Sequence, residues 1–329
     1  MGSLGQPQAD TLADSYNHGA GFVDQSSLQK PLRTFLFGYP LAHTLAPKLH
    51  ASLFDGISLP WTYSVHETQD ASEFLPALKQ PDIIGCAVTM PYKVKMMSEV
   101  DEVTDEGRII GAINTVFLRK GADGSTRYIG TNTDTIGVRE AFLQNTPKVC
   151  ANAVGKPAMV IGAGGACRAS IHALLEGLGA SRVYLVNRYA HEVVDIIESF
   201  KSTGLKGEIL HVETVEQAAK LETPALIVGC VPDFAPKEQC EITAREVATH
   251  FLSRPENGAV LEMCYHPNPR TTFYELAEKD GWQMVLGTEA MIWQGVAQQI
   301  LWAELPLNSF KVDEAKRIIS KALVDQSHK

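Results

Sequence analysis

A lysine and an aspartate stand in two polar segments of this chain and are suited to proton transfer. Lys93 follows an apolar run and the sequence Thr89-Met-Pro91, which is typical of a helix start. Asp134 closes a loop of Gly, Thr and Asn residues just before another helical segment. A lysine that a carboxylate orients can pass a proton to and from an alcohol or carbonyl oxygen. The two residues are therefore a candidate catalytic pair, although lysine and aspartate in loops are usually solvated surface residues.

The composition limits the classes of protein to which the chain can belong. It has 329 residues, of which 45% are hydrophobic and 20% charged, and this length suffices for two domains of ordinary size. The formal net charge of −9 argues against a nucleic-acid partner. No apolar run approaches the eighteen residues of a membrane span, so no membrane partner is expected.

The cysteines and the first residues indicate the compartment. The six cysteines are scattered, with neither a Cys-x-x-Cys pair nor zinc-site spacing, which favours free thiols, a reducing compartment and no metal. Residues 1–30 are polar and contain neither an apolar nor a basic signal segment. We expect them to form a disordered tail, and we expect the protein to be cytoplasmic.

The next part of the chain predicts a first α/β domain over residues 31–145. Apolar and alternating runs indicate strands, and prolines and amphipathic segments indicate helices between them. The expected strands are 33–38, 61–65, 83–88, 111–117 and 127–129, and the expected helices are 47–54, 72–79, one from Pro91 and 135–145. Residues 146–157 contain two prolines and a glycine, which is typical of a linker.

Regular alternation of strands and helices begins at residue 158 and predicts a second domain over 146–288. Such alternation favours a parallel, doubly wound sheet. The expected strands are 158–162, 182–187, 208–212, 225–229, 259–263 and 283–286. An apolar helix at 289–305 follows a sheet that is already complete. We therefore expect residues 289–325 to fold back and complete the first domain.

A glycine-rich turn follows the first strand of the second domain. The turn contains Gly162, Ala163, Gly164, Gly165 and Ala166, and a helix follows it. A strand, a tight glycine turn and a helix start let the backbone approach a pyrophosphate, as in a Rossmann dinucleotide-binding domain. Cys167 occupies the third small position of the motif, so the pattern alone is imperfect. These five residues, together with Gly287, are candidate cofactor-binding residues.

The tip of the next strand bears on the choice of cofactor. An acidic residue is expected there for NAD, but Asn187 and Arg188 stand in its place. Arg188 could bind a 2′-phosphate or stack on adenine, whereas Glu192 would repel that phosphate. We favour NAD because of Glu192 and keep NADP as the alternative.

Seven ordered segments resemble the shikimate/quinate dehydrogenase family, and the resemblance spans residues 33–303. The first resembles the family's substrate motif, the next three its catalytic segments, and the last three its cofactor loop, a downstream loop and the closing helix. These segments are Gly38–His50, Val88–Lys93, Gly111–Thr115, Asn132–Gly137, Gly162–Ala169, Tyr265–Pro267 and Met291–Gly295.

The resemblance implies a reaction and a role for each matching residue. It implies a two-domain enzyme that reversibly oxidises a ring hydroxyl of quinate or shikimate to the 3-dehydro ketone with NAD or NADP. Lys93 would relay the hydroxyl proton and Asp134 would orient that lysine. Ring hydroxyls and the carboxylate would be bound by Thr89, Asn114, Gln294 and Thr44, with Tyr265 lining the site.

Several of these residues also have a structural interpretation. Thr89 could cap a helix, a role that is compatible with substrate binding. Tyr265 could be an ordinary half-buried loop residue. His43 and His50 are better explained by packing and capping at a helix start than by substrate contact.

The chain departs from the family pattern at positions that concern substrate recognition. Alanine stands at 46, 51 and 87, where the family usually has serine or asparagine, and residues 229–232 lack the usual polar side chains. Ala46 lies where we expect an N-cap, at which loss of a hydroxyl costs about 1 kcal/mol. The retained Lys93, Asn114, Asp134 and Gln294 favour a quinate/shikimate dehydrogenase, and the departures favour a quinate-type substrate preference. Such an enzyme would act on a small ring carboxylate as a monomer or homodimer. A paralogue acting on a modified ring acid and a non-catalytic ligand sensor remain as alternatives.

Overall fold

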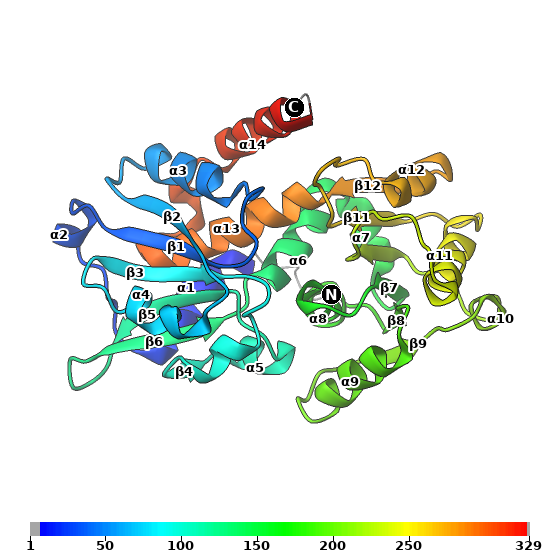
Figure 1. Ribbon diagram of the computed structural model, residues 1–329, viewed down its shortest axis with the longest axis horizontal. Helices are drawn as coiled ribbons and strands as arrows, with labels where there is room; N and C mark the ends of the chain where they lie inside the picture. Colours follow the sequence, from blue (N-terminus) through cyan, green and yellow to red (C-terminus); the bar gives the residue numbers. More distant parts are fainter. Residues whose placement is uncertain (1–6, 328–329) are drawn as a thin grey trace. The chain divides into compact units, whose positions relative to one another are not determined.

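The computed structural model describes residues 7–327, which form two compact units (Figure 1). Unit 1 contains the residues up to Thr133 together with those from Ile292 onward, and unit 2 contains Asp134–Met291. The first boundary therefore lies before the helix α6 (Asp134–Asn145), not after it as we expected. The reason is that α6 packs against α8 and against strands of unit 2. The second boundary lies within α13 (Gly287–Ala303), close to the expected residue 289.

The sheet of unit 1 has the strand order β2-β1-β3-β5-β6-β4. Its strands are β1 (Arg33–Gly38), β2 (Thr62–Glu67), β3 (Ile83–Val88), β4 (Glu102–Val103), β5 (Thr115–Lys120) and β6 (Thr126–Thr131). β5 runs antiparallel to β3 and to β6, whereas the other pairs are parallel. The strand expected from residue 111 begins only at Thr115, because Gly111 ends a preceding helix in the left-handed conformation with φ +71°.

Unit 1 also contains helices, of which some pack on this sheet and the last packs on another helix. They are α3 (Ala46–Gly56), η2 (Ala71–Glu73), α4 (Phe74–Leu78), η3 (Lys95–Ser98), α5 (Asp105–Ile110), η5 (Leu307–Ser309) and α14 (Val312–Ser327), besides α13. In α3, Leu49, Leu53 and Phe54 are buried on one face, which explains why this segment is an amphipathic helix. Phe37 and Phe74 meet edge to face at 5.2 Å in the core between β1 and α4.

The helix that we expected from Pro91 does not form. Residues 90–94 make turns, and only the short helix η3 follows. The N–H of Met97 bonds to the carbonyl oxygen of Val94, while the carbonyl oxygen of Lys93 accepts the N–H of Ile113 at 2.8 Å. The N–H of Met96 does bond to the carbonyl oxygen of Tyr92 at 2.9 Å, but the contact with Ile113 takes the place of the next helical hydrogen bond, and Lys93 lies in a turn.

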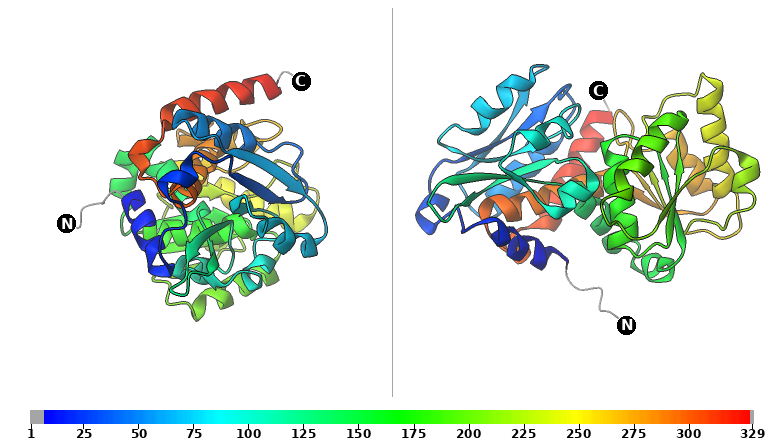
Figure 2. Two further views of the ribbon diagram at one scale, coloured as in Figure 1. Left: turned by 90° about the vertical axis from the view of Figure 1, so that its left-hand side faces the viewer. Right: turned by 90° about the horizontal axis from the view of Figure 1, so that it is seen from below.

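The segment that we expected to be a disordered tail is folded over residues 7–28. It contains α1 (Pro7–Ser15), η1 (Tyr16–His18) and α2 (Gln25–Leu28), and residues 1–6 lie outside the described residues. Arg119, which is fully buried, bonds to the Ser15 hydroxyl, and the Glu304 carboxylate accepts the N–H groups of Phe22 and Val23 at 2.7 and 2.9 Å. Figure 2 shows the dark blue N-terminal helix beside the orange C-terminal part of α13. Buried polar contacts therefore hold a segment whose composition is polar.

Unit 2 has the predicted parallel, doubly wound sheet with the strand order β12-β11-β10-β7-β8-β9. Its strands are β7 (Pro157–Ile161), β8 (Arg182–Val186), β9 (Glu208–His211), β10 (Leu226–Gly229), β11 (Ala259–Glu262) and β12 (Gln283–Leu286). All neighbouring strands are parallel. β7 and β10 are neighbours although β8 and β9 lie between them in sequence, so the order reverses beside β7. In sheets of this kind, ligands bind outside the carboxyl ends of the strands at that point.

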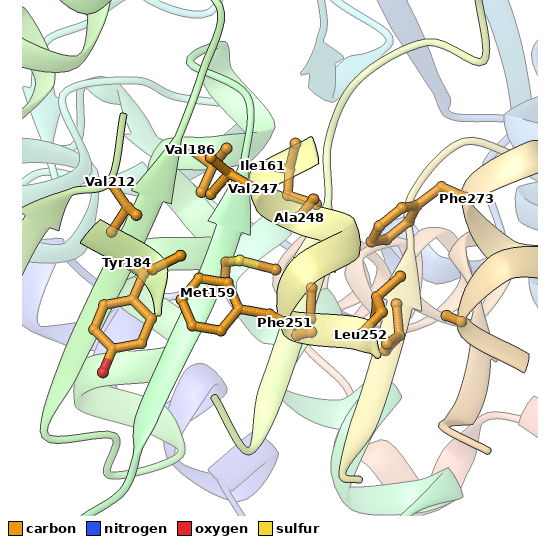
Figure 3. Close-up of a cluster of buried hydrophobic side chains, with 14 of the residues drawn as sticks. Met159, Ile161, Tyr184, Val186, Val212, Val247, Ala248, Phe251, Leu252 and Phe273 are labelled. Atoms are coloured by element: carbon orange, nitrogen blue, oxygen red, sulfur yellow. The ribbon is translucent and has the colours of Figure 1, made fainter. Parts of the chain in front are cut away.

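Helices cover both faces of this sheet. They are α6, α7 (Pro147–Ala153), α8 (Gly165–His172), η4 (Ala173–Gly177), α9 (Ala190–Lys201), α10 (Val215–Ala218), α11 (Gln239–Leu252) and α12 (Thr272–Lys279). On one face, Met159 and Tyr184 of the sheet pack with Phe251 and Leu252 of α11 (Figure 3). Residues 146–157, which we expected to be a linker, contain α7 instead. The reason is that Cys150 of this helix is buried, with only 3% of the residue exposed.

Two classes of site find no support in the described residues. None of the helices within residues 7–327 has the length and apolar character that a membrane span needs. In the same range, no group of His, Cys, Asp and Glu residues is arranged to hold a metal ion.

Candidate active site

Unit 1 brings together two side-chain amides that the sequence predicted to bind ring hydroxyls. Asn114 precedes β5 and is 3% exposed, and Gln294 lies on α13. The Nδ2 atom of Asn114 lies 3.3 Å from Oε1 of Gln294 and 3.0 Å from the hydroxyl of Thr133. Three polar side chains from three separate segments therefore meet at one point. Sequence reasoning missed Thr133, although it lies in the motif that ends with Asp134.

A backbone group determines which end of the Asn114 amide faces Gln294. The N–H of Thr133 donates to Oδ1 of Asn114 at 2.7 Å, and a backbone N–H can only be a donor. Oδ1 is therefore the acceptor, and Nδ2 is the end that donates to Gln294. The two hydrogens of Nδ2 are directed to Gln294 and to Thr133, so the three side chains form one hydrogen-bonded group.

A backbone hydrogen bond connects the turn that contains Lys93 to the segment that contains Asn114. Lys93 has a half-buried side chain, and its carbonyl oxygen is bonded to the N–H of Ile113, the residue before Asn114. The turn that carries Lys93 is thereby joined to the segment that carries Asn114. Lys93 and Asn114, which are twenty-one residues apart in the sequence, therefore lie on neighbouring segments of the fold.

The segment predicted to bind a carboxylate lies before α3. The hydroxyl oxygen of the half-buried Thr44 accepts the N–H of Ala46 at 3.2 Å. Ala46 is the first residue of α3 and Leu45 is its N-cap, so our expectation that Ala46 is an N-cap was wrong. The reason is that α3 begins one residue earlier than its proline suggested, with Pro47 as its second residue.

The two histidines of this segment have different environments. His43 is exposed, whereas His50 is fully buried and its ring stacks on Tyr63 at 4.1 Å. Nδ1 of His50 lies 2.9 Å from Nε2 of Gln299, and burial lowers the pKa of His50 to about 3. His50 is a neutral packing residue, in agreement with the structural interpretation.

Thr89 follows β3 and is half-buried against Gly38, where an added Cβ would collide with its methyl group. Its N–H donates to the carbonyl oxygen of Phe37 at 2.9 Å, and its own carbonyl oxygen accepts the N–H of Tyr92. Because η3 begins only at Lys95, Thr89 caps no helix among the described elements.

In unit 2, Asp134 begins α6 and is half-buried. It lies close enough to Cys230, at the end of β10, to influence the thiol. Burial raises the pKa of Cys230 to about 12, and the negative charges of Glu262 and Asp134 add to this shift. Asp134 therefore lies at the carboxyl edge of the parallel sheet, where the fold places ligands.

The glycine turn has the geometry of a dinucleotide loop. Gly162 follows β7 with φ +118°, a conformation that side-chain-bearing residues rarely adopt, and a Cβ there would lie 3.2 Å from Val231. Gly164 directly precedes α8, and a Cβ on it would project into open space in front of the helix. The first turn of an α-helix has N–H groups without partners inside the helix, which suits a pyrophosphate. The residues present therefore fit a nicotinamide dinucleotide, with Ala163, Gly165 and Ala166 in the same turn.

The tip of β8 carries more negative than positive charge. Asn187 donates to the Glu192 carboxylate at 2.7 Å. Arg188 forms an ion pair with Glu241 at 2.6 Å, and its guanidinium lies 4.6 Å from the ring of Tyr189. The side chain of Asn187 thus holds the Glu192 carboxylate near the strand tip, where Asn187 and Arg188 stand in place of the expected acid.

The last residue of β11, before the loop that contains Tyr265, is a buried glutamate that sequence reasoning missed. Glu262 is 2% exposed and accepts the N–H of Cys264 at 3.0 Å. Burial raises its pKa to about 7, against the lowering effect of hydrogen bonds from Cys264 and Thr271. Its only signal in the sequence was an acid at the end of an apolar run. Tyr265 follows in this loop and is half-buried, and burial raises its pKa. Gly287 begins α13, where an added Cβ would collide with the Met263 carbonyl group.

Comparison with known proteins gives relatives over most of the chain. Residues 36–116 match the family described as the shikimate dehydrogenase substrate binding domain. The chain is 37% identical over 311 residues to the quinate dehydrogenase of Emericella nidulans, covering 89% of this chain and 94% of that protein.

Solved structures give the same result. The dehydroquinate dehydratase and shikimate dehydrogenase structure from S. pombe has a TM-score of 0.73 at 30% identity, covering 88% of this chain and 53% of that chain. The shikimate 5-dehydrogenase of Thermus thermophilus, in complex with NADP(H) and shikimate, has a TM-score of 0.66 at 29% identity, covering 87% and 99%. This chain thus spans about half of the S. pombe chain and nearly all of the T. thermophilus chain.

Proposed function

The chain belongs to the shikimate/quinate dehydrogenase family, and on this basis we propose a function for each part of its site. The protein is an NAD(P)-dependent oxidoreductase that reversibly oxidises a ring hydroxyl of quinate or shikimate to the 3-dehydro ketone. The observation that carries this function is the contact between the buried Asn114 and the half-buried Gln294, whose amide groups suit a polyhydroxylated ring. The relatives are dehydrogenases, so a non-catalytic sensor is not favoured.

We propose Lys93 and Asp134 as the catalytic pair. In the oxidation direction, Nζ of Lys93 takes the proton from the hydroxyl oxygen while the hydride leaves the carbon atom that bears this hydroxyl group. A bound nicotinamide supplies the hydride acceptor. In the reverse direction, Lys93 returns the proton to the carbonyl oxygen, so one group serves both directions. Asp134 orients the ammonium group through its negative charge.

Quinate is the substrate that we propose as preferred. Asn114, Gln294 and Thr89 bind ring hydroxyls, Thr44 binds the carboxylate, and Tyr265 lines the site. The methyl group of Ala46, which is 9% exposed, offers no hydrogen bond to a carboxylate. Loss of a donor to a charged group is worth about 1.5–3 kcal/mol, so the carboxylate pocket is looser than one with a serine there.

We propose NAD as the preferred cofactor. Glu192 is held by Asn187 at the tip of β8, where a carboxylate can accept a ribose 2′-hydroxyl. A 2′-phosphate would meet the charges of Glu192 and Glu241, and the charge of Arg188 is already paired. The negative charge at the tip of β8 therefore favours NAD, which lacks the 2′-phosphate, over NADP.

Dissociation constants for the two cofactors test this choice. NAD should bind more tightly than NADP, and Glu192→Gln should narrow the difference by roughly fivefold because one repulsive charge near the surface is removed. Glu278→Gln is the matched control, since Glu278 also lies on unit 2 and pairs with an arginine, Arg270. Tighter binding of NADP by the unaltered protein would overturn the choice of NAD.

Nicotinamide reduction tests the function itself. The purified protein is assayed with quinate and with shikimate, each with NAD and with NADP. We expect the highest kcat/KM for quinate with NAD. Absence of turnover in all four combinations, by a folded protein that binds dinucleotide, would contradict the proposed substrates.

A further inference from the structure

A second glutamine of α13 lies behind the substrate-binding amides. Gln298 is 1% exposed and stands one helical turn after Gln294. Its Nε2 atom donates to the hydroxyl oxygen of Thr115 at 3.0 Å and lies 3.4 Å from the carbonyl oxygen of Asn114. Thr115 is fully buried and faces the same network. Neither residue is among those that we propose to bind the ring.

The directions of these hydrogen bonds follow from their chemistry. The backbone carbonyl oxygen of Asn114 can only accept a hydrogen bond, so the Gln298 atom beside it is the donor Nε2. The Thr115 oxygen therefore accepts from Gln298, and its own hydrogen is directed to Oδ1 of Asn114 at 2.7 Å. Oδ1 of Asn114 thus receives two short hydrogen bonds, one from Thr115 and one from the Thr133 N–H.

The consequence reaches the substrate-facing groups. The Thr133 hydroxyl oxygen accepts from Nδ2 of Asn114 at 3.0 Å, and it lies 3.1 Å from the Thr115 hydroxyl oxygen and 3.4 Å from Oε1 of Gln294. Oε1 of Gln294 accepts the other hydrogen of Nδ2. The Oε1 end of Gln294 is then the acceptor in the network. The Nε2 end is the one suited to donate to a ring hydroxyl oxygen.

We propose that Gln298 and Thr115 are positioning residues that hold Asn114, and through it Gln294, in the donor orientation that recognises ring hydroxyls. This inference rests on the proposed function, because it takes Asn114 and Gln294 as the residues that bind the ring. It adds two residues and a direction of hydrogen bonding that runs from Gln298 through Thr115 to Asn114.

The neighbouring residue Gln299 offers a matched control. It has the same side chain on the same helix and is fully buried, but it contacts Nδ1 of His50 and not the Asn114 network. Loss of its amide should cost stability as loss of the Gln298 amide does. Only Gln298 should change the recognition of the ring.

The experiment compares Gln298→Met, Thr115→Val, the double variant and Gln299→Met in quinate oxidation. Gln298→Met and Thr115→Val should each raise KM roughly tenfold, because an oriented buried hydrogen bond is lost. The change in kcat should stay below about threefold, because the proton-transfer group is untouched. Thr115→Ser keeps the hydroxyl and should recover most of the loss. The double variant should resemble the more impaired single variant, because both residues act in one chain of hydrogen bonds.

Three results would overturn the inference. These are an equal rise of KM in Gln299→Met, additive effects in the double variant, and a KM for Thr115→Val that equals that of the unaltered protein. Calorimetric titration of quinate checks that KM follows binding, and thermal unfolding checks that each variant is folded. If Gln298→Met does not fold, the KM values for quinate of Thr115→Val and Thr115→Ser are compared instead. Turnover by the unaltered protein tests the proposed function separately, so the two failures are distinguishable.

Discussion

The backbone N–H of Thr133 donates to Oδ1 of Asn114 at 2.7 Å, one residue before the proposed catalytic Asp134. This bond joins the two segments that the sequence singled out for chemistry. It makes the orientation of the Asn114 amide, which we propose to bind the ring, depend on the backbone that leads into α6. Recognition of the ring and placement of the aspartate therefore share one short stretch of chain.

Asn114→Asp should weaken ring binding while keeping the shape of the side chain. The new carboxylate keeps an acceptor for the Thr133 N–H but places a second oxygen against Oε1 of Gln294, where Nδ2 now donates. We expect KM for quinate to rise roughly tenfold to a hundredfold. Steady-state kinetics measures this, with dinucleotide affinity as the reference that should not change. An unaltered KM would show that Asn114 does not bind the ring.

Lys93→Ala should remove the proton relay and leave cofactor binding intact. General acid–base groups contribute about 10²–10⁴-fold to rate, so kcat should fall by that factor. The Kd of the dinucleotide should stay the same, because the glycine turn belongs to the other unit. Single-turnover measurement of nicotinamide absorbance gives the rate of the chemical step. A fall in kcat of less than about tenfold would argue against Lys93 as the proton-transfer group.

Glu262→Gln should change how stability depends on pH. Burial raises the pKa of Glu262 from 4.5 to about 7, with the charge of Asp233 adding to the shift and Arg245 opposing it. The folded state therefore keeps a proton that the unfolded chain loses above pH 4.5. Stability falls as pH rises from about 4.5 to 7, by about 3 kcal/mol at most. The glutamine stays neutral and keeps an acceptor for the Cys264 N–H.

Urea unfolding at pH 5 and pH 8 measures this effect. The free energy of unfolding of Glu262→Gln relative to the unaltered protein should be higher at pH 8 than at pH 5, by up to about 3 kcal/mol. Glu208→Gln is a suitable control, because Glu208 is an exposed glutamate on β9. Equal differences at both pH values would mean that Glu262 does not titrate in this range.

Ala46→Ser should tighten binding of the ring carboxylate. The residue begins α3, and its N–H is already bonded to the Thr44 hydroxyl oxygen. A serine hydroxyl at this position is therefore not needed to cap the helix and is available to the carboxylate. A donor to a charged carboxylate should lower KM for shikimate roughly tenfold. Ala42→Ser is the control, because Ala42 is exposed in the same loop. If both variants keep the KM of the unaltered protein, position 46 does not face the carboxylate.

Local pattern was sufficient for most elements of this fold. The apolar runs of unit 2 predicted its strands to within one or two residues, because each strand of a buried parallel sheet is a short apolar run between turn residues. The glycine turn before α8 was also predicted from the sequence, because φ +118° at Gly162 is a conformation that residues with a side chain rarely adopt. The shikimate/quinate dehydrogenase family followed from several such segments in order.

Local pattern failed where distant contacts compete with it. The helix predicted from Pro91 is absent because the Lys93 carbonyl oxygen bonds to Ile113. The polar N-terminal segment is folded because Arg119 and Glu304, far along the chain, supply its hydrogen bonds. Neither partner can be identified from the residues next to the segment.

The sequence by itself determined the family, and with it the prediction that Lys93, Asp134, Asn114 and Gln294 do the chemistry, because their motifs have a recognisable order and spacing. Only the tertiary structure decided how they are supported. It joined Gln298 to Thr115 across 183 residues of sequence. Hydrogen-bond direction and burial arise from groups that meet only after folding, and no periodicity in the chain encodes such meetings.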